Sequence, residues 1–96
     1  MLLTFSCKSV IIYLYYLGVI FMVNFTNIIF DEEWIYSDAY DMDFNVSGKI
    51  KVHRKKEVFE TDCTSVNQFK QASWILRRYV NKGEINQNGQ KKIVWG

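Results

Sequence analysis

A chain of 96 residues has room for one small domain with a modest hydrophobic core, and it is too short for two. Its 49% hydrophobic and 23% charged residues are ordinary for a globular protein. The formal net charge is +2, but residues 1–48 hold one base and six acids, whereas residues 49–96 hold eleven bases and four acids. We expect the acidic and basic runs to be neighbouring strands that largely neutralise each other. The alternative is a nucleic-acid or membrane partner.

Residues 1–30 form an apolar N-terminal segment in which Lys8 is the only charged side chain. The stretch from Val10 to Phe30 is 21 residues long, enough for a helix to cross about 30 Å of hydrocarbon. The sequence therefore predicts a single transmembrane helix, with the N-terminus in the cytoplasm because Lys8 precedes it. Two alternatives stay open. The β-branched and aromatic residues could form buried strands of a cytoplasmic protein, or translation could start at Met22.

Residues 31–40 mix acidic with aromatic side chains, and we assign them to an acidic connector that follows the apolar segment. A short strand is the alternative for this stretch, because it contains Trp34, Ile35 and Tyr36. We expect a small α+β domain from residue 41 to residue 96.

The stretch from Asp41 to Asp62 predicts a three-strand antiparallel meander. Apolar residues alternate with polar ones on both sides of Gly48, which is typical of half-buried strands. If Gly48 takes the αL position of a three-residue loop, opposite charges face each other across the first two strands. The predicted register pairs Phe44 with Ile50, Met42 with Val52, Asp43 with Lys51, Asp41 with His53, Val52 with Phe59, Lys51 with Glu60 and Lys49 with Asp62.

A helix is predicted after the meander. Ser65 and Gln68 fit a capping box, in which the two residues satisfy each other's free backbone N–H groups at the helix start. An apolar stripe with helical spacing follows, and Gly83 suits the position just after the helix end. The stripe, which would cover Met42, Phe44, Ile50, Val52 and Phe59 of the meander, consists of Phe69, Ala72, Ile75, Leu76, Tyr79 and Val80.

The dipeptide Asn88-Gly89 is the strongest two-residue turn signal in the chain, and it predicts a C-terminal β-hairpin with strands at 85–87 and 90–95. The predicted fold class is therefore α+β. In chain order it has an apolar N-terminal segment, a three-strand antiparallel meander, one packed helix and a C-terminal β-hairpin.

Few residues could carry catalysis or hold a metal. His53 is the only histidine, and neither Cys7 nor Cys63 lies in a recognised motif. A catalytic role for His53 competes with a simpler position on the polar face of the meander, beside Asp41. The chain has no Gly-rich phosphate loop and no catalytic signature. We therefore expect no enzyme, no cofactor and no metal.

Basic and aromatic side chains gather on or near the predicted helix and hairpin. Exposed Trp and Arg are common anchors of protein interfaces. On that ground, the candidate protein-binding residues are Trp74, Arg77, Arg78 and Trp95. Clustered bases can instead meet phosphates. On that ground, the candidate nucleic-acid-binding residues are Lys70, Arg77, Arg78, Lys82, Lys91 and Lys92.

We expect a small, non-enzymatic accessory or interaction protein that is anchored in a membrane and contacts another protein. The alternative is a soluble nucleic-acid-associated module that uses the basic helix and the C-terminal hairpin. The absence of Pro and the abundance of Ile, Asn and Lys indicate AT-rich coding DNA, as in phages and mobile elements. Either function depends on surface contacts.

Overall fold

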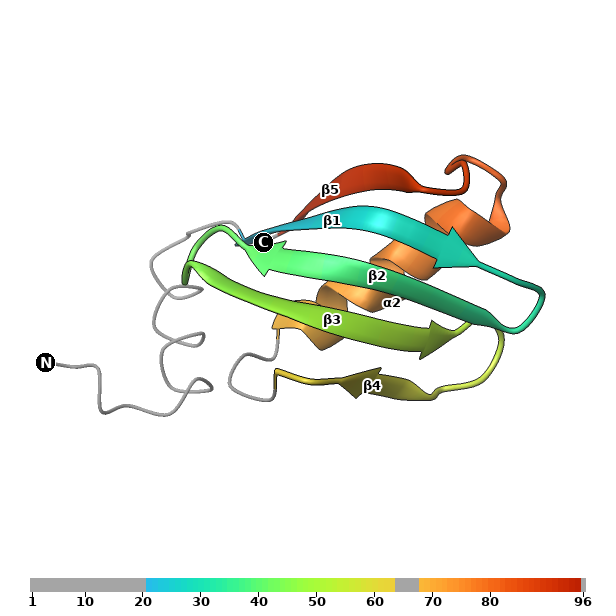
Figure 1. Cartoon of the computed structure of the whole chain (residues 1–96), viewed down its shortest axis with the longest axis horizontal. Helices are drawn as coiled ribbons and strands as arrows, with labels where there is room; N and C mark the ends of the chain where they lie inside the picture. Colours follow the sequence, from blue (N-terminus) through green and yellow to red (C-terminus); the bar gives the residue numbers. More distant parts are fainter. Residues whose placement is uncertain (1–20, 64–67, 96) are drawn as a thin grey trace, which may run out of the picture.

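The computed structural model describes residues 21–63 and 68–95, which form a five-stranded antiparallel sheet with one helix packed on one of its faces (Figure 1). The strands are β1 (Phe21–Phe30), β2 (Trp34–Asp41), β3 (Val46–His53), β4 (Phe59–Thr61) and β5 (Gly89–Trp95), and the helix is α2 (Gln68–Asn81). The spatial order of the strands is β4-β3-β2-β1-β5. The first four strands form a meander, and α2 carries the chain from β4 to the opposite edge of the sheet. The predicted α+β class is confirmed.

Residues 21–30, which belong to the predicted transmembrane segment, form β1, an inner strand of the sheet. The side chains of Phe21, Val23 and Phe25 are buried, whereas those between them are only half-buried. This period of two is typical of a strand with one face on the core. In the described part of the chain, no helix is long and apolar enough to span a membrane. Residues 1–20, which hold the rest of the predicted segment, lie outside the described residues.

A bulge interrupts β1 between Thr26 and Ile29, where its register with β2 shifts. Asn27 within the bulge has a φ of 52°, a left-handed conformation that Asn tolerates better than most residues. The Ser37 hydroxyl donates a hydrogen bond to the carbonyl oxygen of Thr26 at 3.0 Å. The Asn27 amide donates to Asp38 Oδ2 at 2.8 Å, so the bulge positions a polar group beside β2.

The segment assigned to an acidic connector, residues 31–40, contains all of β2 except Asp41, so the sheet begins well before residue 41. β2 pairs with β3 through Ile35 opposite Val52, Asp38 opposite Lys49 and Asp41 opposite Val46. This register contradicts the one drawn around Gly48. The predicted pairs that are wrong are Phe44 with Ile50, Met42 with Val52, Asp43 with Lys51 and Asp41 with His53.

The turn between β2 and β3 explains this difference. Asp41 Oδ1 accepts hydrogen bonds from the backbone N–H groups of Asp43 and Phe44 at 2.8 and 3.0 Å, and so holds a turn that the sequence assigned to a strand. Asn45, with a φ of 56°, takes the left-handed position expected of Gly48. Met42 is exposed in this turn, so its predicted place in the core is wrong.

The predicted register of the third strand is confirmed. Val52 pairs with Phe59, and Lys51 pairs with Glu60. The next residues continue this alignment, because the Asp62 N–H donates to the carbonyl oxygen of Lys49 at 3.3 Å.

The predicted helix is confirmed, and its apolar stripe packs on Ile50 and Val52 of the sheet as expected, but not on Met42. Gly83 has a φ of 76°, its N–H donates to the carbonyl oxygen of Val80 at 3.0 Å, and the Glu84 N–H donates to that of Tyr79 at 3.0 Å. These two bonds define a Schellman motif with glycine at the left-handed position. Ser65 of the predicted capping box lies outside the described residues.

The predicted C-terminal hairpin is wrong. Asn88 and Gly89 do form a turn, in which the Gly89 N–H donates to the carbonyl oxygen of Asn86 at 3.0 Å. However, the first predicted strand at 85–87 is irregular, and β5 pairs with β1. Gln87 forms hydrogen bonds with the backbone N–H and carbonyl of Phe30 at 3.1 and 2.6 Å. The Gln87 side chain therefore satisfies the Phe30 backbone groups that a neighbouring strand would otherwise pair with.

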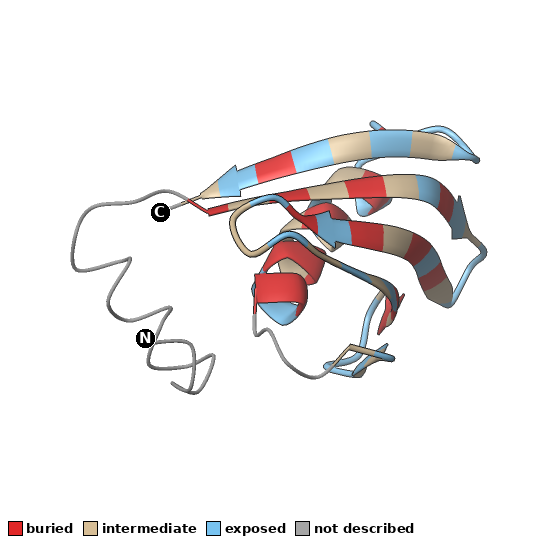
Figure 2. Ribbon diagram, turned by 60° about the vertical axis from the view of Figure 1, so that its left-hand side comes forward, coloured by how far each residue is buried: buried red, intermediate tan, exposed pale blue. Residues whose placement is uncertain are grey.

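The hydrophobic core lies between α2 and one face of the sheet. Figure 2 shows buried and exposed residues alternating along the longer strands, as expected when only one sheet face is covered. The core consists of Val23, Phe25, Ile28, Ile35, Ala39, Ile50, Val52, Phe69, Ala72, Leu76, Val80, Ile85 and Ile93.

Candidate functional site

The sheet face opposite α2, here called the open face, is the candidate site. In Figure 1 it is turned toward the reader, with α2 behind the sheet. Strand registers place on it the side chains that alternate with the core residues. They are Met22, Asn24, Thr26 and Ile29 of β1, Trp34, Tyr36, Asp38 and Tyr40 of β2, Ser47, Lys49, Lys51 and His53 of β3, Glu60 of β4, and Gln90, Lys92 and Val94 of β5.

β2, the middle strand of the sheet, has an inverted distribution of side-chain sizes from Tyr36 to Tyr40, whereas Ile35 before them is buried in the core. Ser37 and Ala39 face the helix and are 5% and 3% exposed, whereas Tyr36 and Tyr40 lie on the open face and are 40% and 37% exposed. Trp34 also lies on the open face, where it is half-buried. In a sheet with one covered face, the larger apolar side chains normally point to the core. The open face is therefore unusually rich in aromatic surface.

An ion pair crosses the middle of the open face. Lys49 Nζ lies 2.7 Å from Asp38 Oδ1, and the Asn27 amide bonds to the other oxygen of the same carboxylate. The hydrogen bonds from Lys49 and Asn27 hold the pKa of Asp38 below its ordinary value. The carboxylate is thus ionised and oriented, although the pair itself is largely exposed to solvent.

Lys51 occupies a different environment on the same strand. Its ammonium group lies 4.2 Å from the ring centroid of Trp34 and 5.7 Å from that of Tyr36. Both distances are in the range of cation–π contacts. The lysine thereby contacts two aromatic side chains of β2.

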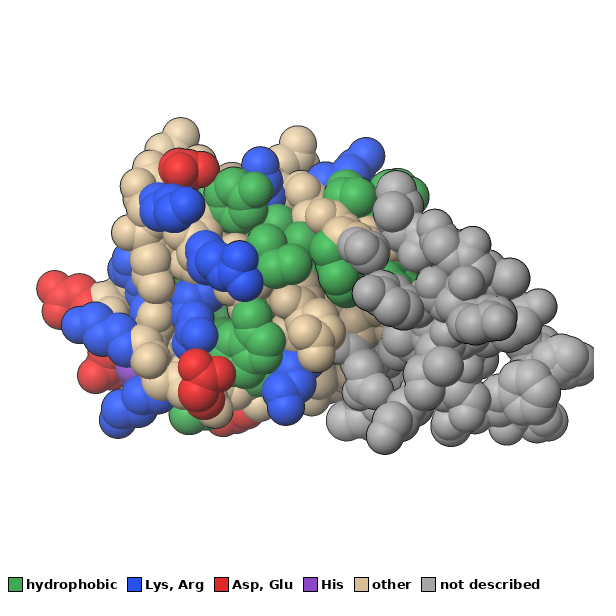
Figure 3. Space-filling model, turned by 180° about the vertical axis from the view of Figure 1, so that it is seen from behind, with side chains coloured by type: hydrophobic (Ala, Val, Ile, Leu, Met, Phe, Trp, Pro, Cys, Tyr) green, Lys and Arg blue, Asp and Glu red, His purple; other side chains and the backbone are tan. Residues whose placement is uncertain are grey.

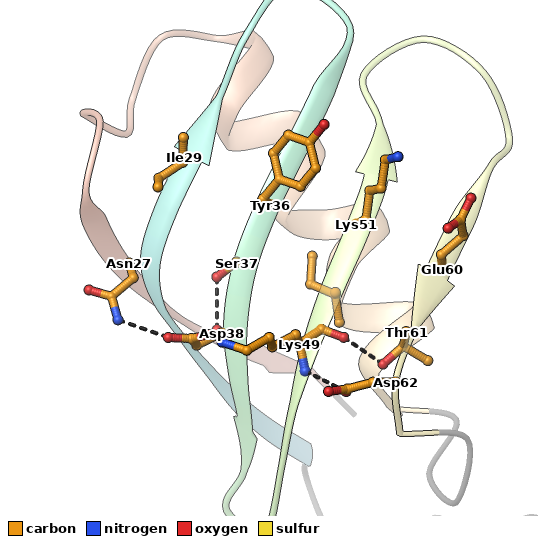
Figure 4. Close-up of a pocket in the computed structure, with 11 residues that line it drawn as sticks. Asn27, Ile29, Tyr36, Ser37, Asp38, Lys49, Lys51, Glu60, Thr61 and Asp62 are labelled. Carbon is orange, nitrogen blue, oxygen red and sulfur yellow. Dashed lines mark hydrogen bonds and ion pairs between the residues drawn. The ribbon is translucent and has the colours of Figure 1, made fainter.

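Two adjacent hollows indent the open face. The first, of about 570 Å³, lies among Ile29, Tyr36, Lys51 and Glu60, as Figure 4 shows. The second, of about 470 Å³, lies beside Tyr40. Asp38, Lys49 and Asp62 line both hollows, so the central ion pair separates them.

Two predicted protein-binding residues on α2 make contacts within the fold. The ring of Trp74 lies 6.2 Å from that of Phe59 and 4.6 Å from the Arg77 guanidinium carbon. Arg77 Nη1 also donates to the carbonyl oxygens of His53 and Lys56 at 3.1 and 2.8 Å. Arg77 therefore joins α2 to the turn between β3 and β4, and little of its side chain is left for a ligand.

The other basic candidates do not form one surface. Lys70, Arg78 and Lys82 are exposed on α2 or directly after it. Lys91 points to the helix side, with Nζ 4.4 Å from the Tyr79 ring centroid. Lys92, the next residue, lies on the open face. Figure 3, which views the molecule from behind, shows Lys and Arg side chains among hydrophobic and acidic ones.

Trp95, the last predicted protein-binding residue, lies at the end of β5 opposite Phe21 of β1. The two ring centroids are 5.6 Å apart, and Trp95 is half-buried. This tryptophan packs against the edge of the core, far along the strand from Lys91.

His53 is buried, and the position predicted for it beside Asp41 is wrong. It pairs with Trp34, whose ring centroid lies 4.8 Å from that of the imidazole. His53 Nδ1 accepts hydrogen bonds from the backbone N–H groups of Lys55 and Lys56, each at 3.0 Å. These bonds give the imidazole a structural role in the turn after β3.

Sequence reasoning missed the aromatic residues of the open face. Trp34, Tyr36 and Tyr40 recur with the spacing of a strand face, which was the available signal. Large apolar residues are normally expected to face the core, so this pattern did not indicate a surface.

In the described ranges 21–63 and 68–95, no group of three or more His, Cys, Asp or Glu side chains is placed to hold a metal ion. No family model, no curated protein and no solved structure matches the chain. The candidate site therefore rests on the geometry of the open face.

Proposed function

We propose that the chain is a non-enzymatic interaction protein that binds a protein partner through the open face of its sheet. The observation that carries this proposal is the inverted β2, which exposes Tyr36 and Tyr40 while Ser37 and Ala39 face the core. Aromatic side chains are enriched at the centres of protein interfaces, where they supply much of the binding energy.

The surroundings of β2 support a protein partner. Ile29 on β1 and Val94 on β5 are 49% and 50% exposed on the same face, near opposite ends of β1. Together with Tyr36 and Tyr40, they add apolar contact area to the open face. The bases of the face, Lys49, Lys51 and Lys92, are matched in number by the acids Asp38 and Glu60 of the face and Asp62, which borders it directly after β4.

The nucleic-acid alternative has less support. Binding to a polyanion relies on bases that face the same phosphates. Lys91 and Lys92 point to opposite sides of the sheet, and Arg77 donates hydrogen bonds to two backbone carbonyls. The acids of the open face would also repel a phosphate chain.

Site-specific photo-crosslinking in cells that make the protein tests the proposed function. A photoreactive amino acid in place of Tyr36 is expected to form a covalent adduct with one predominant protein species. The same amino acid in place of Arg78, exposed on the helix side, is the matched control and should not form that adduct. Adducts only from position 78 would refute the proposal, and recovery of nucleic acid from position 36 would favour the alternative.

A further inference from the structure

We propose that one end of the sheet docks on the surface of a lipid bilayer. It is the end at which β1 begins and at which β2 and β5 finish, on the left in Figure 1, and it is here called the apolar end. The side chains that define it are those of Met22, Met42, Val94 and Trp95. This inference does not depend on the proposed function, which rests on the middle of β2.

Backbone contacts bring these four residues together. Met22 pairs with Val94, and Phe21 pairs with Trp95 at the next position of the same ladder. The Met42 N–H donates to the carbonyl oxygen of Met22 at 3.1 Å, so the turn between β2 and β3 lies beside the start of β1. Met42 and Val94 are 40% and 50% exposed. Apolar side chains gain free energy when they move from water into hydrocarbon, so this end favours an apolar environment.

Charged side chains gather at the other end of the sheet, here called the charged end. Three connections lie there, namely the turn at 31–33, the turn at 54–58 and the loop at 82–88. They hold three, four and two charged residues, respectively. An end with so many charges would lose much hydration if it met a bilayer.

The apolar end carries much less charge to desolvate. Among its described residues, the charged side chains that reach the surface are Asp43, Asp62 and Lys70. The Asp43 carboxylate also accepts a hydrogen bond from the Met22 N–H at 2.9 Å, so part of its hydrogen-bonding capacity is met within the protein. The two ends of the sheet therefore differ in polarity, and the apolar end is the one suited to a lipid surface.

The chain also enters the domain at the apolar end. Residues 1–20 precede Phe21, and the run from Val10 to Ile20 contains no charged residue. Runs of this length occur in interfacial membrane segments as well as in buried core elements. Trp95 lies opposite Phe21, and Trp is enriched at the level of lipid headgroups. A bilayer at this end would thus receive both the apolar run and the apolar end.

Fluorescent labels on the full-length chain test this orientation, with Ser in place of Cys7 and Cys63. A fluorophore that brightens in apolar surroundings is attached to Met42→Cys at the apolar end or to Glu32→Cys at the charged end. When vesicles of phosphatidylcholine are added, the label at position 42 is expected to brighten and the label at position 32 should not change. Both positions are exposed, so neither label has to enter the core.

Matched substitutions test whether the apolar end contributes to binding. Met42→Asp should weaken the partitioning of the full-length chain to these vesicles by about tenfold, because a partly buried methionine is replaced by a carboxylate that stays in water. Val58→Asp is the control and should leave partitioning unchanged, since Val58 is an apolar residue of similar exposure, 37%, in the turn at 54–58. Thermal unfolding without vesicles separates a lost contact from a lost fold, and the label at position 42 supplies a second readout if Met42→Asp unfolds.

Three results would overturn this inference. The first is a full-length chain that stays in solution when vesicles are present. The second is vesicle binding in which the label at position 42 does not brighten, because residues 1–20 would then tether the domain without contact at the apolar end. The third is equal brightening at positions 42 and 32, since neither end would then be preferred. None of these results bears on photo-crosslinking from position 36, which tests the proposed function.

Discussion

Arg77 Nη1 donates a hydrogen bond to the carbonyl oxygen of His53 at 3.1 Å, and this bond ties the second half of α2 to the end of β3. The same nitrogen donates to the carbonyl oxygen of Lys56 at 2.8 Å, and Nη2 lies 3.2 Å from Glu57 Oε1. One guanidinium thus holds both ends of the turn between β3 and β4 against the helix. The guanidinium can serve these acceptors together because Nη1 and Nη2 each carry two N–H donors in a fixed planar fork.

Arg77→Ala is expected to lower the free energy of unfolding by about 2 kcal/mol, since it removes charged hydrogen bonds to two carbonyl groups. Arg77→Lys should recover less than half of this loss, because an ammonium group cannot reproduce the fork. Urea denaturation measures both effects. Glu57→Ala is the control and should be nearly neutral, because the Glu57 side chain is 79% exposed. An unchanged midpoint for Arg77→Ala would contradict the structural role of this residue.

His53 allows a second test of the same turn, through its side chain. Removal of the imidazole by His53→Ala should cost about 2 kcal/mol, because two backbone N–H groups lose their acceptor in a buried site. In His53→Asn, Oδ1 can take the place of Nδ1, so we expect a smaller loss. His53→Gln places its amide farther from the backbone and should resemble His53→Ala. An equal loss of stability in His53→Asn and His53→Gln would show that the hydrogen bonds to Nδ1 do not stabilise the turn.

The buried carboxyl of Asp41 predicts a pH-dependent effect. Burial raises the pKa of Asp41 above its ordinary value of 3.8, although hydrogen bonds from the backbone of Phe44 and Asp43 oppose this shift. Between the ordinary and the raised pKa, the folded state binds more protons than the unfolded state, so the Asp41 contribution to stability falls as pH rises. Asp41→Asn has no carboxyl group at this position, so its stability does not include this decrease with rising pH. Its stability relative to the wild type should therefore increase from about pH 3 to about pH 7.

Asp38 provides a control of opposite sign for that experiment. Its pKa is lowered by the hydrogen bonds from Lys49 and Asn27, so its stabilising effect is present above the ordinary value of 3.8 and is lost as pH falls. Asp38→Asn should therefore be less stable than the wild type at neutral pH, and this difference should shrink in acid. Denaturation curves across the pH range give both comparisons. If the stability of Asp41→Asn and that of the wild type changed with pH in the same way, the raised pKa would not belong to Asp41.

The close packing around Gly48 allows us to predict the effect of adding one methyl group there. A Cβ at this position would lie 2.9 Å from Cys63 Cβ and 2.9 Å from Phe69 Cε2, which is closer than side chains pack. We expect Gly48→Ala to cost about 1–3 kcal/mol through overpacking between β3 and α2. Thermal or urea unfolding measures this loss.

Gly83→Ala is the matched comparison, because nothing lies within 4 Å of its added Cβ. Its φ of 76° should still cost about 1 kcal/mol, and Gly83→Asn should cost less, because Asn tolerates this conformation. A neutral Gly48→Ala would show that Phe69 moves aside freely.

Local signals explain which parts of the fold could be predicted. The helix and its end at Gly83 depend on neighbouring residues, so the sequence indicated both correctly. The first hairpin depended on whether Gly48 or Asn45 takes the left-handed position. Alternating charges supported the wrong choice, because they did not reveal that the Asp41 side chain accepts bonds from the turn.

Long-range pairing explains what could not be predicted. β5 pairs with β1, a strand that lies about sixty residues earlier in the sequence. The Asn88-Gly89 turn had instead indicated that β5 pairs with the residues directly before the turn. The candidate site was missed for a related reason. Trp34 and Tyr36 belong to a surface only because β2 lies in the middle of the sheet with α2 on its other side.

The position of β5 at the end of the described chain determines when β1 can gain its second neighbouring strand during synthesis. β1 is made first among the described strands, but its second neighbour in the sheet is Gly89–Trp95. Until that stretch leaves the ribosome, one edge of β1 has unpaired backbone N–H and C=O groups next to Val23 and Phe25. Such an edge is a template for pairing with other chains. The nascent chain is therefore prone to such pairing from the time β1 emerges until Gly89–Trp95 has followed it.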